Sequence, residues 1–411
     1  MADSLHVAID GNEANVTHRV GSNVYAFELL GRLAAIVSDQ PRLKVTVLLA
    51  DQPAADLPPP SQRWQYQQVT PRRLWTQWGL PLYLYRHRQR FDVFFTPGHY
   101  APRFCPLPYV SSVLDLAFLY FPEQFRRSDL LQLKHWTRYS VKHAAKVLTI
   151  SQFTKKDIIK HYRRDSQDIT VAYPSVELSS KPTAADTSRA RHRYRLGDHD
   201  YLVSVGTLQP RKNLIRLIEA YEGLRRQLAS LTAKPDRTKQ PGNLKLVLVG
   251  KIGWLAEPIL KRVASSGFRD DIVLTGYVDQ ADKLALIKGA SCLSLVGLYE
   301  GFGIPALEAL RLKTVPVVSS TTSLPEVVGQ AGITVDPCST NAIQRGLFKA
   351  VTLTDRRQTR YHQLGRAQVE LFSGEQSARA VLRTILTAVP QHPVKDDIVH
   401  HLRLTTNSTG H

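Results

Sequence analysis

The sequence predicts an α/β protein made of two Rossmann-like domains, each built around a parallel sheet. Short β-like runs alternate with helical patterns from the first residues onward, and this alternation is typical of βαβ units. The alternation lapses between residues 174 and 200 and then begins again. With 411 residues, the chain is too long for one ordinary core and has the length of two domains.

The first domain is predicted at residues 1–178. A helix is predicted at 23–37 because apolar residues recur there at helical spacing, and Ser151 is a typical N-cap for a second helix at 153–161. Strands are predicted near residues 5–9, 44–49, 91–95, 109–113, 146–150 and 169–172. Together these elements predict one parallel sheet with crossover helices.

The second domain is predicted at residues 179–372. It follows a connection over residues 174–200 that is rich in Ser, Thr, Pro and Ala and contains a predicted short helix at 189–194. Residues 232–243 are predicted to form an exposed loop, and residues 391–411 a disordered tail. Strands are predicted near residues 201–205, 244–249, 272–274, 292–296 and 315–318.

The composition argues against several classes of protein. Hydrophobic residues make up 43% and charged residues 22%, which is the balance of a folded chain rather than a disordered one. Cys105, Cys292 and Cys338 lack the paired spacing of a disulfide framework or a zinc site. The first ten residues lack a signal peptide's basic and apolar regions, and no uncharged apolar run reaches the roughly 18 residues of a spanning helix. We therefore expect a cytoplasmic protein that is neither secreted nor integral to a membrane.

A formal net charge of +19 predicts an anionic partner. Nucleic acid, acidic lipid and phosphorylated ligands would all satisfy this charge. The basic residues of the N-terminal half fit a solvated helix surface and a membrane-facing one equally well, although their neighbours Trp136 and Tyr139 slightly favour an interface. These basic residues are Arg86, Arg88, Arg90, Lys134, Arg138, Lys142, Lys146, Lys155, Lys156, Lys160, Arg163 and Arg164.

The most informative segment is residues 292–312, which predicts a buried strand, a glycine-rich turn and then a helix. Pro305 suits the first turn of that helix, where its missing N–H costs nothing. Gly301 and Gly303 would let the backbone approach a ligand, and the helix N-terminus would offer unpaired N–H groups to an anion. A lone Gly-x-Gly before a helix is weak evidence, since many ordinary turns contain it.

Two glutamates sharpen this prediction. Glu300 precedes the turn and Glu308 lies in the helix, so both would flank a crevice at the C-terminal edge of a parallel sheet, where such folds bind ligands. An ionised carboxylate accepts hydrogen bonds from two neighbouring hydroxyls, which suits the diol of a ribose or hexose. Either residue alone would fit an ordinary surface glutamate, but the spacing of the two within this turn favours a ligand-binding site.

A second cluster of candidates follows the strand at 201–205. Arg211 and Lys212 lie at the predicted start of the next helix, where cations oppose the helix dipole. A guanidinium and an ammonium together suit a diphosphate, so this electrostatic conflict suggests that an anion lies between them. Gly206 and Gly250, which directly follow two of the predicted strands, are further candidate contacts for the same ligand.

These motifs resemble those of glycosyltransferase family 4, a retaining group whose members have two facing Rossmann-like domains, the GT-B fold. The resemblance extends from Val7 to about Leu386. Its most specific part is YEGFGIPALEAL, with the family's Glu-x7-Glu spacing at Glu300 and Glu308. The other parts are VVSSTTSLPEVVGQAG at 317–332, PRKN at 210–213 and ISQFTKKDI at 150–158.

The resemblance implies a role for each residue of the donor site. Glu308 would bind the ribose diol of a nucleotide sugar. Glu300 and the backbone around Phe302 and Gly303 would bind the donor sugar, and Leu324 would lie near the nucleotide. Such a site holds the donor in the second domain, while the acceptor would enter from the first.

The implied chemistry is sugar transfer with retention of the anomeric configuration. Arg211 and Lys212 would stabilise the departing nucleoside diphosphate, so no metal and no cofactor is expected. Residues 373–389 resemble the family's closing helix, which crosses back to the first domain.

Two residues depart from the family pattern. Leu114 stands beside Asp115 where many members carry a histidine, which puts a histidine contribution to catalysis in doubt. Gly374 stands where family members frequently carry an aromatic residue, and it would loosen the closing helix. Asp115 and Gly21, which precedes a helix expected to be capped near Ser22, are candidates for contact with a phosphate or the acceptor.

The resemblance favours GDP-mannose as the donor, with other nucleotide sugars left open. The acceptor would be a polysaccharide or a lipid-linked glycan, with the basic helices at an anionic membrane surface. Three rival functions differ in class: a catalytically degenerate binding subunit, a basic nucleic-acid-binding protein on an enzyme-like scaffold, and an NAD-dependent enzyme. The chain contains no RNA- or DNA-reading motif and no glycine fingerprint after its first strand, which disfavours the last two.

Overall fold

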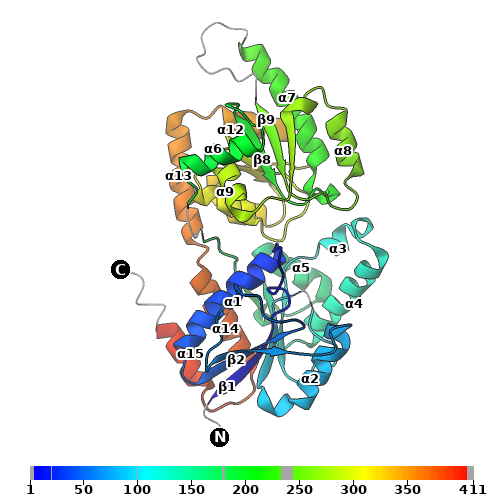
Figure 1. The fold of residues 1–411 in the computed structure, drawn as a ribbon, viewed down its shortest axis with the longest axis vertical. Coiled ribbons are helices and arrows are strands. Elements are labelled where there is room, and N and C mark those ends of the chain that lie inside the picture. Colours follow the sequence, from blue (N-terminus) through cyan, green and yellow to red (C-terminus); the bar gives the residue numbers. More distant parts are fainter. Residues whose placement is uncertain (1–3, 20, 99, 178–180, 233–243, 405–411) are drawn as a thin grey trace. The chain divides into compact units, whose positions relative to one another are not determined.

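The computed structural model describes residues 4–19, 21–98, 100–177, 181–232 and 244–404 (Figure 1). The chain divides into two compact units. Unit 1 comprises residues 1–175 and 372–411, and unit 2 comprises residues 176–371. The domain boundaries predicted from the sequence, at 178 and 372, lie a few residues from these divisions.

The described residues of unit 1 form seven strands: β1 (Leu5–Asp10), β2 (Leu43–Leu49), β3 (Trp64–Gln68), β4 (Val93–Thr96), β5 (Tyr109–Val113), β6 (Lys146–Thr149) and β7 (Ile169–Val171). They form one parallel sheet in the order β3-β2-β1-β4-β5-β6-β7. The order reverses between β1 and β4, as in doubly wound folds. The central strands β4 and β5 are buried along their whole length, which is expected where helices cover both faces of a parallel sheet.

The helices of unit 1 are α1 (Ser22–Ser38), α2 (Leu80–Arg86), α3 (Ala117–Tyr120), α4 (Arg127–His143), α5 (Gln152–Tyr162), α14 (Gly374–Ala388) and α15 (Lys395–Leu404). Helix α14 packs against α1, α15 and strands β4 to β7, so the end of the chain completes the unit formed by its beginning. Figure 1 shows α1, α14 and α15 on one side of the sheet and α2, α4 and α5 on the other.

In the part of unit 2 that the structure describes there are six strands: β8 (Tyr201–Val205), β9 (Lys245–Val249), β10 (Ile272–Gly276), β11 (Cys292–Leu295), β12 (Pro316–Ser319) and β13 (Ile333–Val335). The sheet is parallel, in the order β10-β9-β8-β11-β12-β13. This order is the Rossmann arrangement, with its reversal between β8 and β11. The predicted fold class, two Rossmann-like α/β domains, is therefore confirmed.

The helices of unit 2 are α6 (Ala184–Arg193), α7 (Leu214–Thr232), α8 (Glu257–Ala264), α9 (Gln280–Lys288), α10 (Ile304–Arg311), α11 (Leu324–Val328), α12 (Thr340–Val351) and α13 (Asp355–Glu370). Helices α7 and α12 pack together, as do α6 with α9 and α10 with α13. Among the described residues, each unit has a hydrophobic core of its own, with Phe94 and Phe118 in unit 1 and Leu202 and Tyr221 in unit 2.

The sequence did not predict β3 or β13, each of which is one of the two edge strands of its sheet. Strand β3 has the polar sequence WQYQQ, and β13 is only three residues long. An edge strand pairs on one side only and is often short or polar, so it carries a weak apolar signal.

The prediction of disorder for residues 391–411 was wrong for 395–404, which form α15. Ile398 and Leu402 are buried, and Arg42 donates a hydrogen bond to Asp397 (Nη1 to Oδ2, 2.8 Å). Residues 405–411 and the predicted loop at 232–243, apart from the end of α7, lie outside the described residues.

The two predicted helix caps differ in outcome. Ser151 caps α5, since its Oγ accepts a hydrogen bond from the Thr154 N–H (3.0 Å). Ser22 is not a cap, because its Oγ donates to Glu13 (2.5 Å) and the N-cap position of α1 is Gly21, with φ +54°. None of the described helices combines the length and apolarity needed to cross a bilayer.

Candidate active site

The candidate donor site lies at the point where the strand order of unit 2 reverses. Arg211 and Lys212 follow β8, and Glu300 follows β11, the two strands on either side of the reversal. Open α/β sheets bind ligands in the crevice beyond the carboxyl ends of such a strand pair. The sheet order therefore brings together residues that are 88 positions apart in the sequence.

The turn after β8 is held in place by Asn213. Residues 210–212 form one 3₁₀ turn, and Asn213 follows it in the left-handed region with φ +60°. The Asn213 amide donates hydrogen bonds to the carbonyls of Val296 (2.9 Å) and Pro337 (2.7 Å), and the Leu298 N–H donates to the Arg211 carbonyl (2.8 Å). These bonds fix the basic turn against the loop that carries Glu300.

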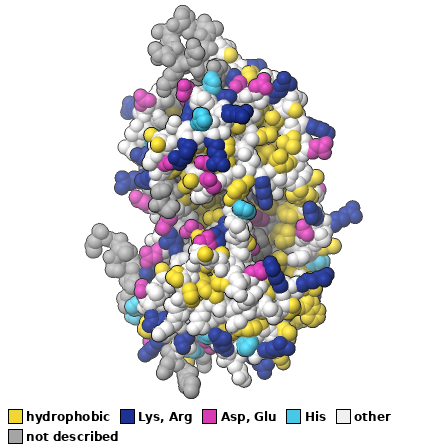
Figure 2. All heavy atoms as spheres, in the orientation of Figure 1, with side chains coloured by type: hydrophobic (Ala, Val, Ile, Leu, Met, Phe, Trp, Pro, Cys, Tyr) yellow, Lys and Arg dark blue, Asp and Glu magenta, His cyan; other side chains and the backbone are white. Residues whose placement is uncertain are grey.

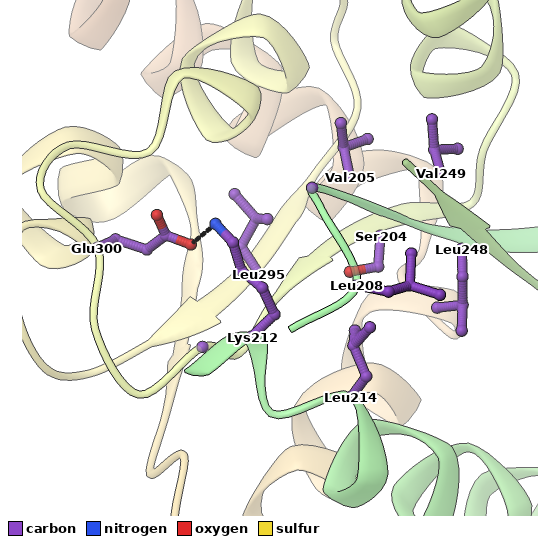
Figure 3. Close-up of a pocket in the computed structure, with 11 residues that line it drawn as sticks. Ser204, Val205, Leu208, Lys212, Leu214, Leu248, Val249, Leu295 and Glu300 are labelled. Atoms are coloured by element: carbon purple, nitrogen blue, oxygen red, sulfur yellow. Dashed lines mark hydrogen bonds and ion pairs between the residues drawn. The ribbon is translucent and has the colours of Figure 1, made fainter. Parts of the chain in front are cut away.

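Lys212 and Glu300 form an ion pair inside the crevice. The Lys212 Nζ donates to the Glu300 Oε1 at 2.5 Å, and the two side chains are only 16% and 11% exposed (Figure 3). The sequence predicted that the basic turn attracts an external anion because its cations oppose a helix dipole. In the structure, Glu300 itself balances the Lys212 charge, while the Arg211 guanidinium donates to the Tyr299 carbonyl (3.3 Å).

A small pocket surrounds this ion pair. Figure 3 shows Lys212 and Glu300 pointing toward each other beside apolar side chains from the ends of the central strands. Gly206 and Gly250, with φ of +152° and +145°, end β8 and β9, and a Cβ at Gly250 would lie 2.1 Å from the Gly206 carbonyl oxygen. The pocket is lined by Ser204, Val205, Gly206, Leu208, Lys212, Leu214, Leu248, Val249, Leu295, Gly297 and Glu300.

The glycine-rich turn before α10 is fastened by Ser323. The Ser323 Oγ lies within hydrogen-bond distance of the carbonyls of Glu300 (2.8 Å) and Phe302 (3.0 Å). Gly303 is the N-cap of α10 with φ +103°, and a Cβ there would lie 2.5 Å from Leu324. Glycine is therefore needed at position 303 both for its backbone conformation and for the approach of α11.

Glu308 is almost completely buried, with 1% of its surface exposed. Its Oε1 accepts hydrogen bonds from Lys283 Nζ (2.6 Å) and Gln280 Nε2 (3.3 Å), both on α9. Within the part of the chain that the structure describes, its Oε2 has no hydrogen-bond partner. Burial of a carboxylate oxygen without a partner is costly, so this atom is suited to accept a bond from a ligand.

The sequence missed several residues that build this site. Lys283, Gln280, Ser323 and Asn213 orient the predicted residues but were not assigned to the site. Lys283 and Gln280 lie in an ordinary helical pattern 25 and 28 positions before Glu308, so no local signal marks them. Gly301, in contrast, lies in the turn between Glu300 and α10, as predicted.

The candidates of the first domain lie in unit 1. Asp115 accepts a hydrogen bond from the Ala117 N–H (Oδ1, 3.0 Å) and so supports the start of α3. Leu114, at the position of the family histidine, is 4% exposed. Gly21 has open space around it, since a Cβ at this position would meet no atom within 4 Å.

Gly374 is the first residue of the closing helix α14. It is buried at the start of α14, whose N-terminus is capped by Ser373. A Cβ at Gly374 would lie 2.3 Å from Arg32 Nε and 2.4 Å from Ser175 Oγ, so a side chain at this position would require these two side chains to move.

The reversal point of unit 1 holds an acid that the sequence did not single out. Asp10 ends β1, accepts a hydrogen bond from the Asn12 N–H (3.0 Å) and lies 3.5 Å from the Thr96 Oγ1 at the end of β4. Burial, and to a smaller extent the negative charge of Glu13, raise the pKa of Asp10 to about 7. An acidic residue directly after the first predicted strand is the signal that could have identified it.

Comparison with known families decides the class of this protein. A model for Glycosyltransferase Family 4 matches residues 21–180, and a model for Glycosyl transferases group 1 matches residues 186–367. The chain belongs to glycosyltransferase family 4. The matches follow each other along the chain and cover the strand-turn-helix segments that carry the basic turn and the two glutamates of this glycosyltransferase.

Several relatives of this glycosyltransferase are mannosyltransferases. It is 29% identical over 268 residues to O-antigen chain mannosyltransferase B of Escherichia coli, covering 65% of this chain and 67% of that one. It is 24% identical over 244 residues to O-antigen chain mannosyltransferase RfbU of Salmonella typhimurium, covering 59% of this chain and 61% of that one. A match to the serotype-specific mannosyltransferase WbdA of Escherichia coli is 30% identical over 213 residues, half of this chain, but spans only 24% of WbdA.

Solved structures share the fold of this glycosyltransferase. HepE from Anabaena, in complex with UDP and glucose, matches with a TM-score of 0.69 and 14% identity, covering 93% of this chain and 100% of that one. WaaG, a glycosyltransferase involved in lipopolysaccharide biosynthesis, matches with a TM-score of 0.67 and 15% identity, covering 93% and 99%. At these identities the likeness establishes the fold alone.

Proposed function

We propose that this glycosyltransferase moves a mannosyl group from GDP-mannose to a hydroxyl of a polysaccharide or lipid-linked glycan, with retention of the anomeric configuration. The observation that carries the proposal is the strand reversal of unit 2, where Lys212 and Glu300 line one pocket and Glu308, on the helix that follows Glu300, has a buried carboxylate oxygen without a partner among the described residues. The names of the mannosyltransferase relatives support mannose as the sugar.

Glu308 would bind the ribose of the donor. Lys283 and Gln280 hold its Oε1, which leaves the buried Oε2 to accept a hydrogen bond from a ribose hydroxyl. A bound donor would thereby give a hydrogen bond to the Glu308 Oε2, which is otherwise buried without a partner among the described residues. This gain is specific to a ligand with a hydroxyl at that position.

Lys212 would bind the diphosphate together with Arg211. On donor binding, the Lys212 ammonium would exchange Glu300 for a phosphate oxygen, and Glu300 would become free to accept hydrogen bonds from the donor sugar. Helix α10 begins directly after Gly303 and has eight residues, and the positive end of its dipole favours an anion near this turn.

The proposed reaction breaks the bond between the anomeric carbon and the diphosphate oxygen and forms a bond to the acceptor oxygen on the same face. The acceptor hydroxyl proton passes to the departing phosphate oxygen. Fixed positive charge that stabilises this leaving group would supply much of the acceleration. Because Lys212 and Arg211 carry that charge, we propose that the reaction needs no metal, and transfer that persists in excess EDTA would support this.

Glu308→Gln tests the donor site. The amide keeps the shape of the side chain but offers one acceptor oxygen in place of two, so GDP-mannose should bind at least about tenfold more weakly. Thermal shift with GDP-mannose, UDP-glucose, GDP and UDP measures binding, and transfer to an oligosaccharide acceptor measures turnover. The matched control is Glu370→Gln, an exposed glutamate on α13 of the same unit.

The outcomes separate the rival functions. Stabilisation by UDP-glucose but not by GDP-mannose would replace the proposed donor while keeping the site. Donor binding without transfer to any acceptor would favour a degenerate binding subunit, which the loss of the family histidine at Leu114 first suggested. Unchanged donor affinity in Glu308→Gln would contradict the assigned ribose contact.

A further inference from the structure

Unit 1 exposes a stripe of large apolar side chains before and along α2. Leu74, Trp78, Leu82 and Tyr85 are 55%, 68%, 43% and 59% exposed. They recur every three or four residues through a π-helical turn at 75–79 and the following α2, which places them on one side of the segment. We call these four residues the α2 stripe.

The opposite side of the same segment is buried. Trp75, Leu80 and Leu84 belong to the core of unit 1, and the Trp75 indole N–H donates to the Val69 carbonyl (3.1 Å). A Cβ at Gly79 would lie 2.7 Å from the Pro71 carbonyl oxygen. The segment is thus apolar on two sides, and the core fixes the inner side so that the α2 stripe is held outward.

Arginines flank the α2 stripe in the sequence, and one of them, Arg72, forms an ion pair with Asp51 (2.9 Å). Between Leu57 and Phe91 the chain has six arginines and no lysine, aspartate or glutamate. Arg73 precedes the stripe, Arg86 and Arg88 follow it, and the Arg88 guanidinium lies 4.8 Å from the centre of the Tyr85 ring. Figure 2 shows hydrophobic and basic side chains next to each other over the elements α2 and α4 of Figure 1.

This combination of side chains is suited to bind the surface of a lipid bilayer. Trp and Tyr prefer the boundary between headgroups and acyl chains, where an aromatic ring meets an apolar and a wet environment at once. Leucine side chains enter the acyl region, and arginines beside them bind anionic headgroups. Each component of the stripe therefore has a partner in an anionic lipid surface.

We infer that the α2 stripe is a membrane-binding surface that docks unit 1 on an anionic lipid bilayer. It inserts Trp78 and Leu82 at the level of the headgroups, while Arg73, Arg86 and Arg88 contact lipid phosphates. The inference adds an attachment surface to the proposed sugar transfer. It is tested without donor or acceptor, so either proposal can fail alone.

A second copy of the chain is a poorer occupant. A twofold contact through the α2 stripe would place the same arginine-flanked segment of each copy against the other, and no acid between residues 57 and 91 could compensate. An anionic bilayer supplies the missing negative charge. Self-association is nevertheless a measurable outcome of the experiment below.

The test is flotation of the full chain with vesicles of phosphatidylcholine alone or with about one lipid in three replaced by phosphatidylglycerol. The wild-type chain should float with the anionic vesicles, and less so in high salt. Trp78→Ser with Leu82→Ser should lower partitioning by at least about tenfold, because both inserted side chains are lost. Arg86→Gln with Arg88→Gln should weaken the preference for phosphatidylglycerol, because two of the three proposed phosphate contacts are lost.

Matched controls lie in unit 2. Ile252→Ser removes another exposed apolar side chain (59%), and Arg356→Gln with Arg357→Gln removes two exposed charges from α13. Both controls should float like the wild type, and circular dichroism should show that every variant is folded.

Three results would overturn the inference. The first is a wild-type chain that does not bind anionic vesicles at low salt. The second is an equal loss of binding in the stripe variant and the controls. The third is a dimer in sedimentation velocity that dissociates in Trp78→Ser with Leu82→Ser while vesicle binding is absent, which would assign the stripe to self-association.

Discussion

Lys212 and Glu300 come from the ends of two neighbouring strands, and their ion pair sets the charge of the donor crevice. Both side chains are largely removed from water, so loss of either partner leaves the other charge poorly solvated. The pair also keeps the Lys212 ammonium beside Gly206, whose missing side chain leaves space around the Lys212 stem. The two residues therefore have a structural role in the ligand-free protein and a proposed chemical role with the donor.

Lys212→Ala should lower the rate of sugar transfer by at least about a hundredfold, since it removes a cation that stabilises the leaving diphosphate. Initial-rate measurements with GDP-mannose check this. Lys349→Ala, which removes an exposed lysine on α12, should keep the wild-type rate. A Lys212→Ala enzyme that is folded and fully active would rule out the proposed diphosphate contact.

Asp10 makes the stability of unit 1 depend on pH. Its pKa is about 7 in the folded chain, against an ordinary value of 3.8. As the pH rises from about 4 to 7, the unfolded carboxyl ionises first, so the folded state holds more protons and the free energy of unfolding falls. The difference between the two pKa values corresponds to at most roughly 4 kcal/mol.

Asp10→Asn should therefore flatten the decrease in stability between about pH 4 and pH 7, because an amide does not ionise and can still accept the bond from Asn12. Urea unfolding at several pH values measures this. Asp39→Asn, an exposed carboxyl beside the end of α1, should leave the pH dependence unchanged. An Asp10→Asn variant that loses stability with rising pH as steeply as the wild type would refute the assignment.

At the scale of elements, the strand-turn-helix segments of unit 2 explain why a candidate site could be proposed from the sequence. The turn at 301–303 places Gly303 at the N-cap of α10 and keeps Glu300 and Glu308 on either side of it. The local sequence predicted this turn and the start of α10, since the spacing of the glycines and Pro305 affect the backbone conformation within one turn. The partners of the glutamates come from the turn after β8 and from α9, which local sequence could not indicate.

Gly250→Ala should destabilise the chain by at least about 2 kcal/mol, because its φ of +145° disfavours a side chain and the new Cβ would meet the Gly206 carbonyl. Urea unfolding measures the loss. Gly267→Ala is the matched control, since a Cβ there meets no atom within 4 Å and its φ is not positive. Equal stability of the two variants would show that the close approach of the turns after β8 and β9 is not needed.

For the whole molecule, the chain folds into two units with separate sheets and separate cores. Unit 1 is completed by α14 and α15, so the two ends of the chain belong to the same unit. The residues assigned to the donor lie in unit 2, while the α2 stripe and Asp10 lie in unit 1. The proposed donor site and the proposed membrane-binding surface thus belong to different units.

GDP-mannose should therefore raise the unfolding temperature of unit 2 more than that of unit 1. A ligand that binds only the folded state at a hundredfold excess over its Kd adds about 2.7 kcal/mol of stability. Differential scanning calorimetry with and without the donor resolves the transitions, and Glu308→Gln identifies the one that belongs to unit 2. One transition that shifts as a whole would contradict independent unfolding of the units.

The sequence by itself determined the local features of this protein. The alternation of strands and helices, the cap at Ser151, the glycine turn and the two glutamates depend on residues close together in the chain, where periodicity and backbone preference act. The sequence did not predict strands β3 and β13 or helix α15, because polar or short segments carry little apolar signal.

Only the tertiary structure decided which charges meet. Lys212 and Glu300 are 88 residues apart, and Lys283 and Glu308 are 25 apart, so their pairing depends on the order of strands in the sheet. The same holds for the α2 stripe, whose apolar residues look like core residues in the sequence. Packing buries Trp75 and Leu84 and leaves Trp78 and Tyr85 in solvent, because one helical segment can turn only one side to the core.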